Sequence, residues 1–138
     1  MLTNIKEATI VEMWQLMQAC GSTIKIVELE KLLDDVDHKQ GYLWTDAGEL
    51  IGFYLLKRHW HDEYIIQFIG VSPLHRRKGK GTFLIDTFFD VIRMDRHVTV
   101  KVLLTASNIP TIFFFTRCGF VEERRENGVV TLVRCEWC

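Results

Sequence analysis

The clearest candidate for chemistry in the sequence is a short cationic stretch with two glycines, at residues 76–82, with the sequence Arg-Arg-Lys-Gly-Lys-Gly-Thr. An apolar run from Tyr64 to Val71 precedes it, and Pro73 ends that run because proline lacks an N–H and fixes φ. Apolar residues at helical spacing follow between residues 82 and 94. The first-turn N–H groups of a helix have no intrahelical partner, and glycine lets the backbone approach an anion closely. The sequence therefore predicts a strand, a cationic loop and a helix N-terminus that together bind phosphate or pyrophosphate.

Other phosphate-binding and nucleic-acid motifs do not fit this stretch. The sequence lacks the Gly-x-x-x-x-Gly-Lys-Ser/Thr spacing of a Walker loop, and a dinucleotide fingerprint would need a small residue where Leu84 stands. The stretch has no interleaved aromatic residues, which argues against a nucleic-acid surface. Seventeen basic and eighteen acidic residues leave a formal charge of -1, so no global field favours nucleic acid or a membrane. A solvated surface turn is the simplest alternative to an anion site.

The elements that must position this stretch follow from the spacing of the apolar residues. Strands are expected near residues 2–6, 42–44, 50–57, 63–71, 97–105, 120–125 and 129–137, and helices near residues 9–21, 27–36, 82–94 and 108–117. A capping box at Thr9 and Glu12 marks the start of the first helix, and Asn127 with Gly128 marks the turn of a final hairpin. The order β-αα-βββ-α-β-α-ββ predicts an α/β fold. We expect a single domain over residues 1–138, with a mixed, mostly antiparallel sheet of six or seven strands flanked by about four helices.

Two motifs in this order resemble those of the GNAT superfamily of acyl-CoA-dependent N-acetyltransferases. Residues 69–81 are similar to the family's apolar strand followed by Val-x-Pro and Arg/Gln-x-x-Gly-x-Gly/Ala. The family's later pattern is an asparagine, a small residue, an aromatic pair and Gly-Phe, and it appears here as Asn108, Thr111, Phe114-Phe115 and Gly119-Phe120. The glycine loop alone is weakly specific, whereas the two motifs at this separation are specific. The resemblance covers nearly the whole chain.

The resemblance implies that acetyl-CoA is the acyl-donor substrate. Backbone amides from Arg77 to Thr82 would hold the CoA pyrophosphate. Main-chain groups of Ile69 and Val71 would pair with the pantetheine arm, to which Asn108 would also bond. The cofactor-binding residues implied in this way are Ile69, Gly70, Val71, Arg76, Arg77, Lys78, Gly79, Lys80, Gly81, Thr82, Asn108, Phe114 and Phe115. The implied partners are acetyl-CoA and an amine acceptor, with no metal, and the chain would be a monomer or a homodimer.

The implied reaction transfers an acetyl group to a primary amine, of a small molecule or a peptide, by direct attack on the thioester. The family's usual acid is a tyrosine, but Phe115, which has no hydroxyl, stands at that position. At the positions of the usual glutamate base, the chain has Ile65, Gln67 and Leu103. Gln67, by position, and Glu63, by chemistry, are therefore the candidate catalytic residues. The alternative is a catalytically weak or inactive CoA-binding module.

Two further clusters could carry chemistry, but each has a simpler explanation. Residues 59–63, with the sequence His-Trp-His-Asp-Glu, place possible metal ligands two residues apart, and a surface hairpin explains them without a metal. Cys135 and Cys138 form a Cys-x-x-Cys pair, with no helix after it to activate a thiol, so free thiols are expected. The sequence shows no signal peptide and no apolar run of about 18 residues, and a cytoplasmic location is therefore expected.

Overall fold

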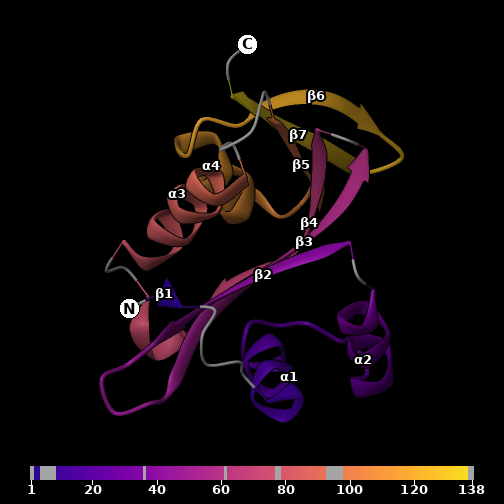
Figure 1. Ribbon diagram of the computed structural model, residues 1–138. Helices are drawn as coiled ribbons and strands as arrows, with labels where there is room; N and C mark the ends of the chain where they lie inside the picture. Colours follow the sequence, from indigo (N-terminus) through magenta and orange to yellow (C-terminus); the bar gives the residue numbers. More distant parts are fainter. Residues whose placement is uncertain are drawn as a thin grey trace.

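The computed structural model describes residues 2–3, 9–35, 37–60, 62–76, 79–92 and 98–136. In chain order its elements are β1 (Leu2–Thr3), α1 (Ile10–Ala19), α2 (Ile26–Asp34), β2 (His38–Trp44), β3 (Leu50–Trp60), β4 (Glu63–Val71), the short 3-10 turn η1 (Pro73–His75), α3 (Lys80–Ile92), β5 (Val98–Thr105), α4 (Ile109–Arg117), β6 (Val121–Glu126) and β7 (Val129–Glu136). Apart from η1, this is the order expected from the sequence (Figure 1).

The strands form one sheet, which over the described residues has seven strands in the order β1-β2-β3-β4-β5-β7-β6. Among these strands β4 and β5 run parallel, and every other neighbouring pair is antiparallel. The expected mixed, mostly antiparallel sheet is therefore confirmed. A parallel pair needs a crossover connection, and α3 supplies it between β4 and β5.

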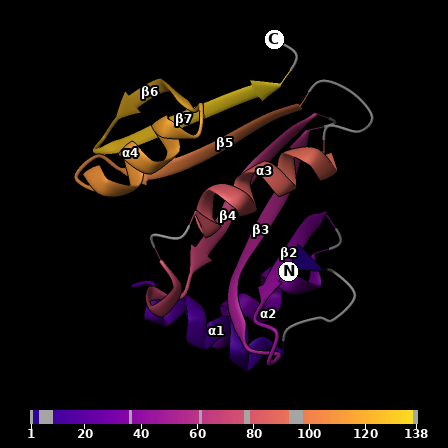
Figure 2. The same cartoon turned by 90° about the vertical axis from the view of Figure 1, so that its left-hand side faces the viewer.

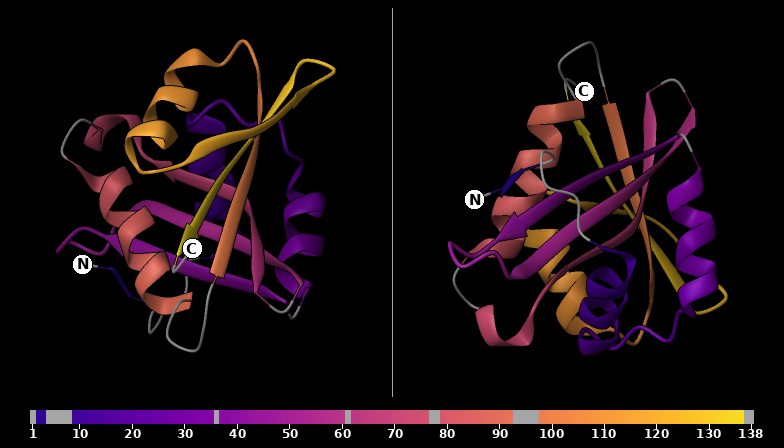
Figure 3. Two further views of the ribbon diagram at one scale, coloured as in Figure 1. Left: turned by 90° about the horizontal axis from the view of Figure 1, so that it is seen from above. Right: turned by 60° about the horizontal axis from the view of Figure 1, so that its bottom comes forward.

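Helices cover both faces of the sheet. Figure 1 shows α1 and α2 on one side and α3 and α4 on the other, and both views of Figure 3 show α2 and α3 on opposite sides of the strands. Each face has its own apolar core. The core under α3 joins Leu84, Ile85, Phe88 and Phe89 of the helix to strand residues such as Val100. The core under α1 and α2 joins Met13, Met17 and Leu29 to strand residues such as Phe53 and Leu55.

Two local signals in the sequence are confirmed in detail. The Thr9 hydroxyl accepts a bond from the N–H of Glu12 at 3.2 Å, and the Glu12 carboxylate accepts one from the N–H of Thr9 at 3.0 Å. This reciprocal pair begins α1 as a capping box. In the last hairpin, Asn127 and Gly128 both have positive φ, at 53° and 77°, as the tight turn between β6 and β7 requires.

Several element ends differ from the expected ones by two residues or more, and three are informative. β2 begins at His38, β3 continues to Trp60, and α3 begins at Lys80. Residues 59–62 were expected to form a polar connection, but Trp60 pairs with Glu63 across the hairpin. Pairing with a neighbouring strand extends the backbone even where polar residues surround the paired one. Polarity alone therefore ends β3 too early.

Candidate functional site

A cavity of about 1050 Å³ lies where the end of β4 meets the first turn of α3 and one side of α4. Every sequence-predicted cofactor residue that the structure describes lines this cavity: Ile69, Gly70, Val71, Arg76, Gly79, Lys80, Gly81, Thr82, Asn108, Phe114 and Phe115. The other two, Arg77 and Lys78, lie outside the described residues. The two motifs, far apart in the sequence, therefore meet at one place in the fold. What they bind stays a prediction.

The cavity lies beside a gap between β4 and β5. Along their described length the two strands pair only through residues 63–65 of β4 and residues 99–101 of β5. Beyond this point β5 continues beside β7. Figure 2 shows β4 and β5 close together at one end and apart at the end where α4 lies. This divergence leaves one edge of β4 without a strand partner, and such an edge can pair with an extended ligand.

Backbone groups of Ile69 and Val71 point toward this gap. The N–H of Ser72 donates to the carbonyl oxygen of Ile51 at 2.7 Å, so Ser72 faces β3. Along an antiparallel pair, residues alternate between bonding to the partner strand and facing away from it. Ile69 and Val71, three residues and one residue before Ser72, therefore face away from β3.

The carbonyl oxygen of Val71 already has two partners. Nε of Arg76 donates to it at 3.1 Å, and Sγ of Cys20, which follows α1, donates at 3.5 Å. Cys20 also limits the space beside the strand, because a Cβ on Gly70 would lie 3.1 Å from its sulfur. Of the main-chain groups predicted to meet a ligand, the N–H of Val71 and both groups of Ile69 are thus the ones left for that role.

Gln67 is the extra residue of a β-bulge. Leu55 of β3 pairs with Phe68 and Leu56 pairs with Ile66, so Gln67 has no partner residue on β3. The bulge changes which positions face α3, since Ile66 before it and Ile69 after it pack against the same core. Gln67 itself is exposed and does not line the cavity.

The first turn of α3 presents backbone donors to the cavity. Gly79, at φ 72°, has the left-handed conformation that glycine adopts freely, and its carbonyl accepts the N–H of Phe83 at 2.9 Å. The N–H groups of residues 80–82 precede this first helical bond and have no intrahelical acceptor. A Cβ on Gly81 would lie 3.0 Å from Cζ of Phe114, so glycine is needed for α3 and α4 to approach this closely.

The described lining of the cavity is cationic. Arg76, Lys80 and Arg117 contribute positive charge, and no acidic side chain is found among the described lining residues. The helix dipole adds a partial positive charge at the start of α3. Charge, unpaired N–H groups and close backbone approach together favour a phosphate or pyrophosphate at this position.

The α4 side of the cavity combines one amide with an aromatic cluster. The carbonyl of Asn108 accepts the first helical bond, from the N–H of Ile112 at 3.1 Å, while its side chain makes no cap bond. Phe115 is 2% exposed and packs edge-on against Phe114 and Phe120, with ring centroids 5.3 and 5.1 Å away. The amide of Asn108 is therefore available to a ligand, whereas Phe115 offers only an apolar surface.

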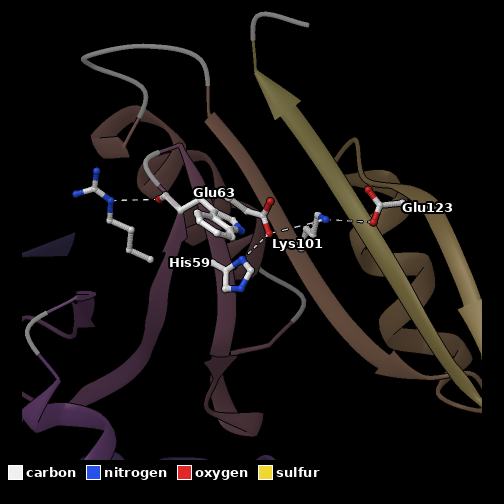
Figure 4. Close-up of polar contacts among 6 residues, drawn as sticks. His59, Glu63, Lys101 and Glu123 are labelled. Atoms are coloured by element: carbon white, nitrogen blue, oxygen red, sulfur yellow. Dashed lines mark hydrogen bonds and ion pairs between the residues drawn. The ribbon is translucent and has the colours of Figure 1, made fainter.

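The structure does not bring Glu63 to the cavity. Glu63 begins β4 at the end where β4 and β5 are paired, about 26 Å along the strand from Val71 at 3.3 Å per residue. Figure 4 shows its carboxylate between Nδ1 of His59, at 3.2 Å, and Nζ of Lys101, at 3.8 Å. Lys101 also contacts Glu123 at 3.2 Å. These contacts make Glu63 part of a charged surface cluster. His61, from the same predicted ligand group, lies outside the described residues.

One expectation about the cysteines is wrong. Cys20 and Cys118 are free, but Cys135 is disulfide-bonded, whereas a free thiol was expected there. Sequence spacing cannot decide this, because a disulfide depends on how close the fold brings two sulfurs. Burial raises the pKa of the Cys118 thiol, and a hydrogen bond with Thr82 partly offsets the rise.

Sequence reasoning assigned no role to three of the residues that line the cavity, namely Cys20, Pro110 and Arg117. Arg117 could have been found, because it follows Phe114 by three residues and so shares a helix face with it. No comparable signal exists for Cys20, since it reaches the cavity from another element.

Comparison with known proteins identifies the family. The sequence model of the Acetyltransferase (GNAT) family matches residues 10–120, which include both motifs and the cavity they form. The chain belongs to the GNAT family. A curated relative, the mycothiol acetyltransferase of Corynebacterium glutamicum, is 28% identical over 109 residues. That match covers 78% of this chain but 36% of the relative, so the chain spans little more than a third of that protein.

Solved structures show the same fold at low sequence identity. The ribosomal-protein-S18-alanine N-acetyltransferase of Escherichia coli has a TM-score of 0.83 at 16% identity, covering 98% of this chain and 92% of that one. The spermidine N-acetyltransferase of Vibrio cholerae, in complex with CoA and spermine, has a TM-score of 0.73 at 20% identity, covering 98% and 94%. The GNAT fold expected from the sequence is therefore confirmed.

Several expectations about this GNAT chain stay predictions. They are the single domain over residues 1–138, the monomeric or dimeric state and the cytoplasmic location. Within the described parts of the chain, no helix combines the length and apolar character needed to cross a membrane.

Proposed function

We propose that this GNAT chain transfers an acetyl group from acetyl-CoA to a primary amine. The observation that carries the proposal is the cavity that joins the open edge of β4 to the first turn of α3. Its shape and charge suit a long substrate with a peptide-like arm and a pyrophosphate. The Vibrio cholerae relative that shares the fold was solved with CoA and a polyamine, which supports the same ligand class here.

In the proposed complex, different parts of the chain hold different parts of acetyl-CoA. The pyrophosphate accepts bonds from the N–H groups of residues 80–82, with charge from Arg76 and Lys80 and, as the sequence predicts, from Arg77 and Lys78. The pantetheine arm runs along β4 as a partial extra strand, bonded to Ile69 and Val71. Asn108 bonds to the same arm from the start of α4.

The proposed reaction is direct attack of the neutral amine on the thioester carbonyl carbon. A C–N bond forms and the C–S bond breaks, while one proton leaves the amine and the CoA sulfur gains one. The protein contributes mainly by holding the two reactants in line, which can replace much of the entropic barrier. Phe115 cannot donate a proton, but a thiol with a pKa of about 8.5 is an acceptable leaving group without full protonation.

The two proposed proton-transfer residues now have unequal support. Gln67 is exposed at the bulge, between the paired part of β4 and the open edge, where its amide could hold a water molecule near the amine. Glu63 is a carboxylate on the same strand. Its contacts with His59 and Lys101 hold it at the end of β4 away from the cavity. We therefore propose Gln67 ahead of Glu63.

An acceptor panel tests the proposal. Acetyl-CoA is incubated with polyamines, amino sugars and peptides with free N-termini, and acetylated products are detected by mass spectrometry. We expect at least one primary amine to gain an acetyl group faster than without protein. Gly81→Glu, which adds bulk and negative charge to the anion site, should abolish the gain. Thr87→Glu, with the same charge at a partly exposed position of α3 that does not line the cavity, should retain it.

A second candidate function, a CoA-binding module with little catalysis, is favoured by Phe115. Saturable CoA binding with no product from any acceptor would select this candidate. Absence of both binding and product would contradict both functions.

A further inference from the structure

The cations that line the cavity come from separate elements. Arg76 follows η1, Lys80 begins α3 and Arg117 ends α4. Arg76 and Lys80 flank the position proposed for the pyrophosphate, whereas Arg117 reaches the cavity from α4. A ligand with two separated anionic groups would use them better.

Arg117 lies at the opposite end of α4 from Asn108. Asn108, the N-cap, and Arg117 are nine residues apart, or roughly 13 Å along the helix axis at 1.5 Å per residue. Phe114, between them, packs against Gly81 in the first turn of α3. Arg117 therefore flanks the anion site from the α4 side, at the end of the cavity away from Asn108.

Arg117 does not cap the C-terminal end of α4. The carbonyl of the C-cap residue, Cys118, accepts a bond from Nη1 of Arg134 on β7, at 2.9 Å. Arg117 is exposed and makes no hydrogen bond or ion pair with another described residue. Its guanidinium is thus left for a ligand.

CoA carries two anionic groups beyond its thioester, the pyrophosphate and the 3′-phosphate on the ribose. Lys80 and its neighbouring backbone N–H groups lie at the position proposed for the pyrophosphate. We infer that Arg117 binds the 3′-phosphate, so that the chain distinguishes CoA from 3′-dephospho-CoA. Two parallel donors of a guanidinium match two phosphate oxygens, which makes arginine well suited to this contact. The inference rests on the proposed function, because it takes the pyrophosphate to lie at the start of α3.

Calorimetric titration with CoA and with 3′-dephospho-CoA tests this assignment. The proteins compared are the unsubstituted chain, Arg117→Gln and the matched control Arg124→Gln. Arg124 is an exposed arginine of β6 that does not line the cavity. Melting temperatures check that all three are equally folded.

We expect Arg117→Gln to weaken CoA binding about tenfold, the size of one lost charge-assisted contact, and to leave 3′-dephospho-CoA within about twofold. Arg124→Gln should change neither. Equal weakening of both ligands by Arg117→Gln would overturn the assignment, and so would an unchanged CoA affinity. If the unsubstituted chain binds neither ligand, the proposed function itself fails, which is a separate result from loss of selectivity alone.

Discussion

At the scale of single residues, Phe115 limits the chemistry more than any other side chain of the cavity. It stands where the resemblance to the GNAT motif implies a tyrosine acid, and its ring is buried among other aromatic rings. General acid catalysis is typically worth about 10²–10⁴-fold. A chain without it can still gain rate from orientation of the reactants. The arrangement therefore favours intact binding with slow turnover.

Phe115→Tyr should raise kcat for acetyl transfer with little change in the KM for acetyl-CoA. The new hydroxyl would project from a cavity-lining ring and donate to the leaving sulfur, for a gain of about tenfold or more. Steady-state kinetics on any acceptor found in the panel measures it. Phe120→Tyr is the matched control, since Phe120 is buried in the same cluster but does not line the cavity. A higher kcat in both variants, or in neither, would contradict the proposal that position 115 is where the general acid is missing.

Cys20 and Cys118, which are free in the described part of the chain, should react differently with iodoacetamide. Burial raises the pKa of Cys118, so at pH 8 less of it is thiolate and its alkylation should be slower than that of a small model thiol. Cys20 lines the cavity, so acetyl-CoA at ten times its Kd should slow its alkylation by about tenfold. Peptide mass spectrometry measures both rates. Protection of Cys118 but not of Cys20 would contradict the placement of the ligand.

At the scale of elements, features that depend on residues close together in the sequence could be predicted. Features that depend on the pairing of distant strands could not. The capping box of α1 and the Asn127–Gly128 turn depend on residues within a few positions, and both are confirmed. The bulge at Gln67 depends on the register between β3 and β4, and no short stretch of the sequence determines that register. The divergence of β4 from β5 likewise depends on which strand each meets next. The sequence could therefore predict that β4 leads to the site, but not that its edge is open.

Arg134 should stabilise the packing of α4 against the rest of the fold. Its guanidinium lies 4.1 Å from the ring centroid of Phe89 on α3 and donates to the carbonyl of Cys118 at the end of α4. Arg134→Met should lower the free energy of unfolding by about 1–3 kcal/mol, because it removes a cation–π contact and a bond to a helix end. Urea unfolding measures the loss, with Arg124→Met as the control. A loss no larger than the control's would contradict the role.

At the scale of the whole molecule, the candidate site draws residues from elements on both faces of the sheet. Cys20 follows α1 on one face, while α3 and α4 cover the other, and β4 lies between them. The sequence predicted the two motif walls because each belongs to a recognisable pattern. It could not predict that Cys20 lines the cavity. Cys20 follows a helix on the opposite face of the sheet, and its position beside β4 depends on how the whole sheet packs.

Because one ligand would contact elements from both faces, acetyl-CoA should stabilise the molecule as a unit. At 100 times its Kd, binding to the folded state alone adds about 2.7 kcal/mol to the free energy of unfolding. For a chain of this length that corresponds to a rise of about 10 °C in Tm, measured by differential scanning calorimetry. Gly81→Glu should lose the rise at the same acetyl-CoA concentration, because the added carboxylate lies in the anion site and its Cβ meets Phe114. Thr87→Glu should keep it. An equal rise in Gly81→Glu would show that acetyl-CoA binds elsewhere and would contradict the site.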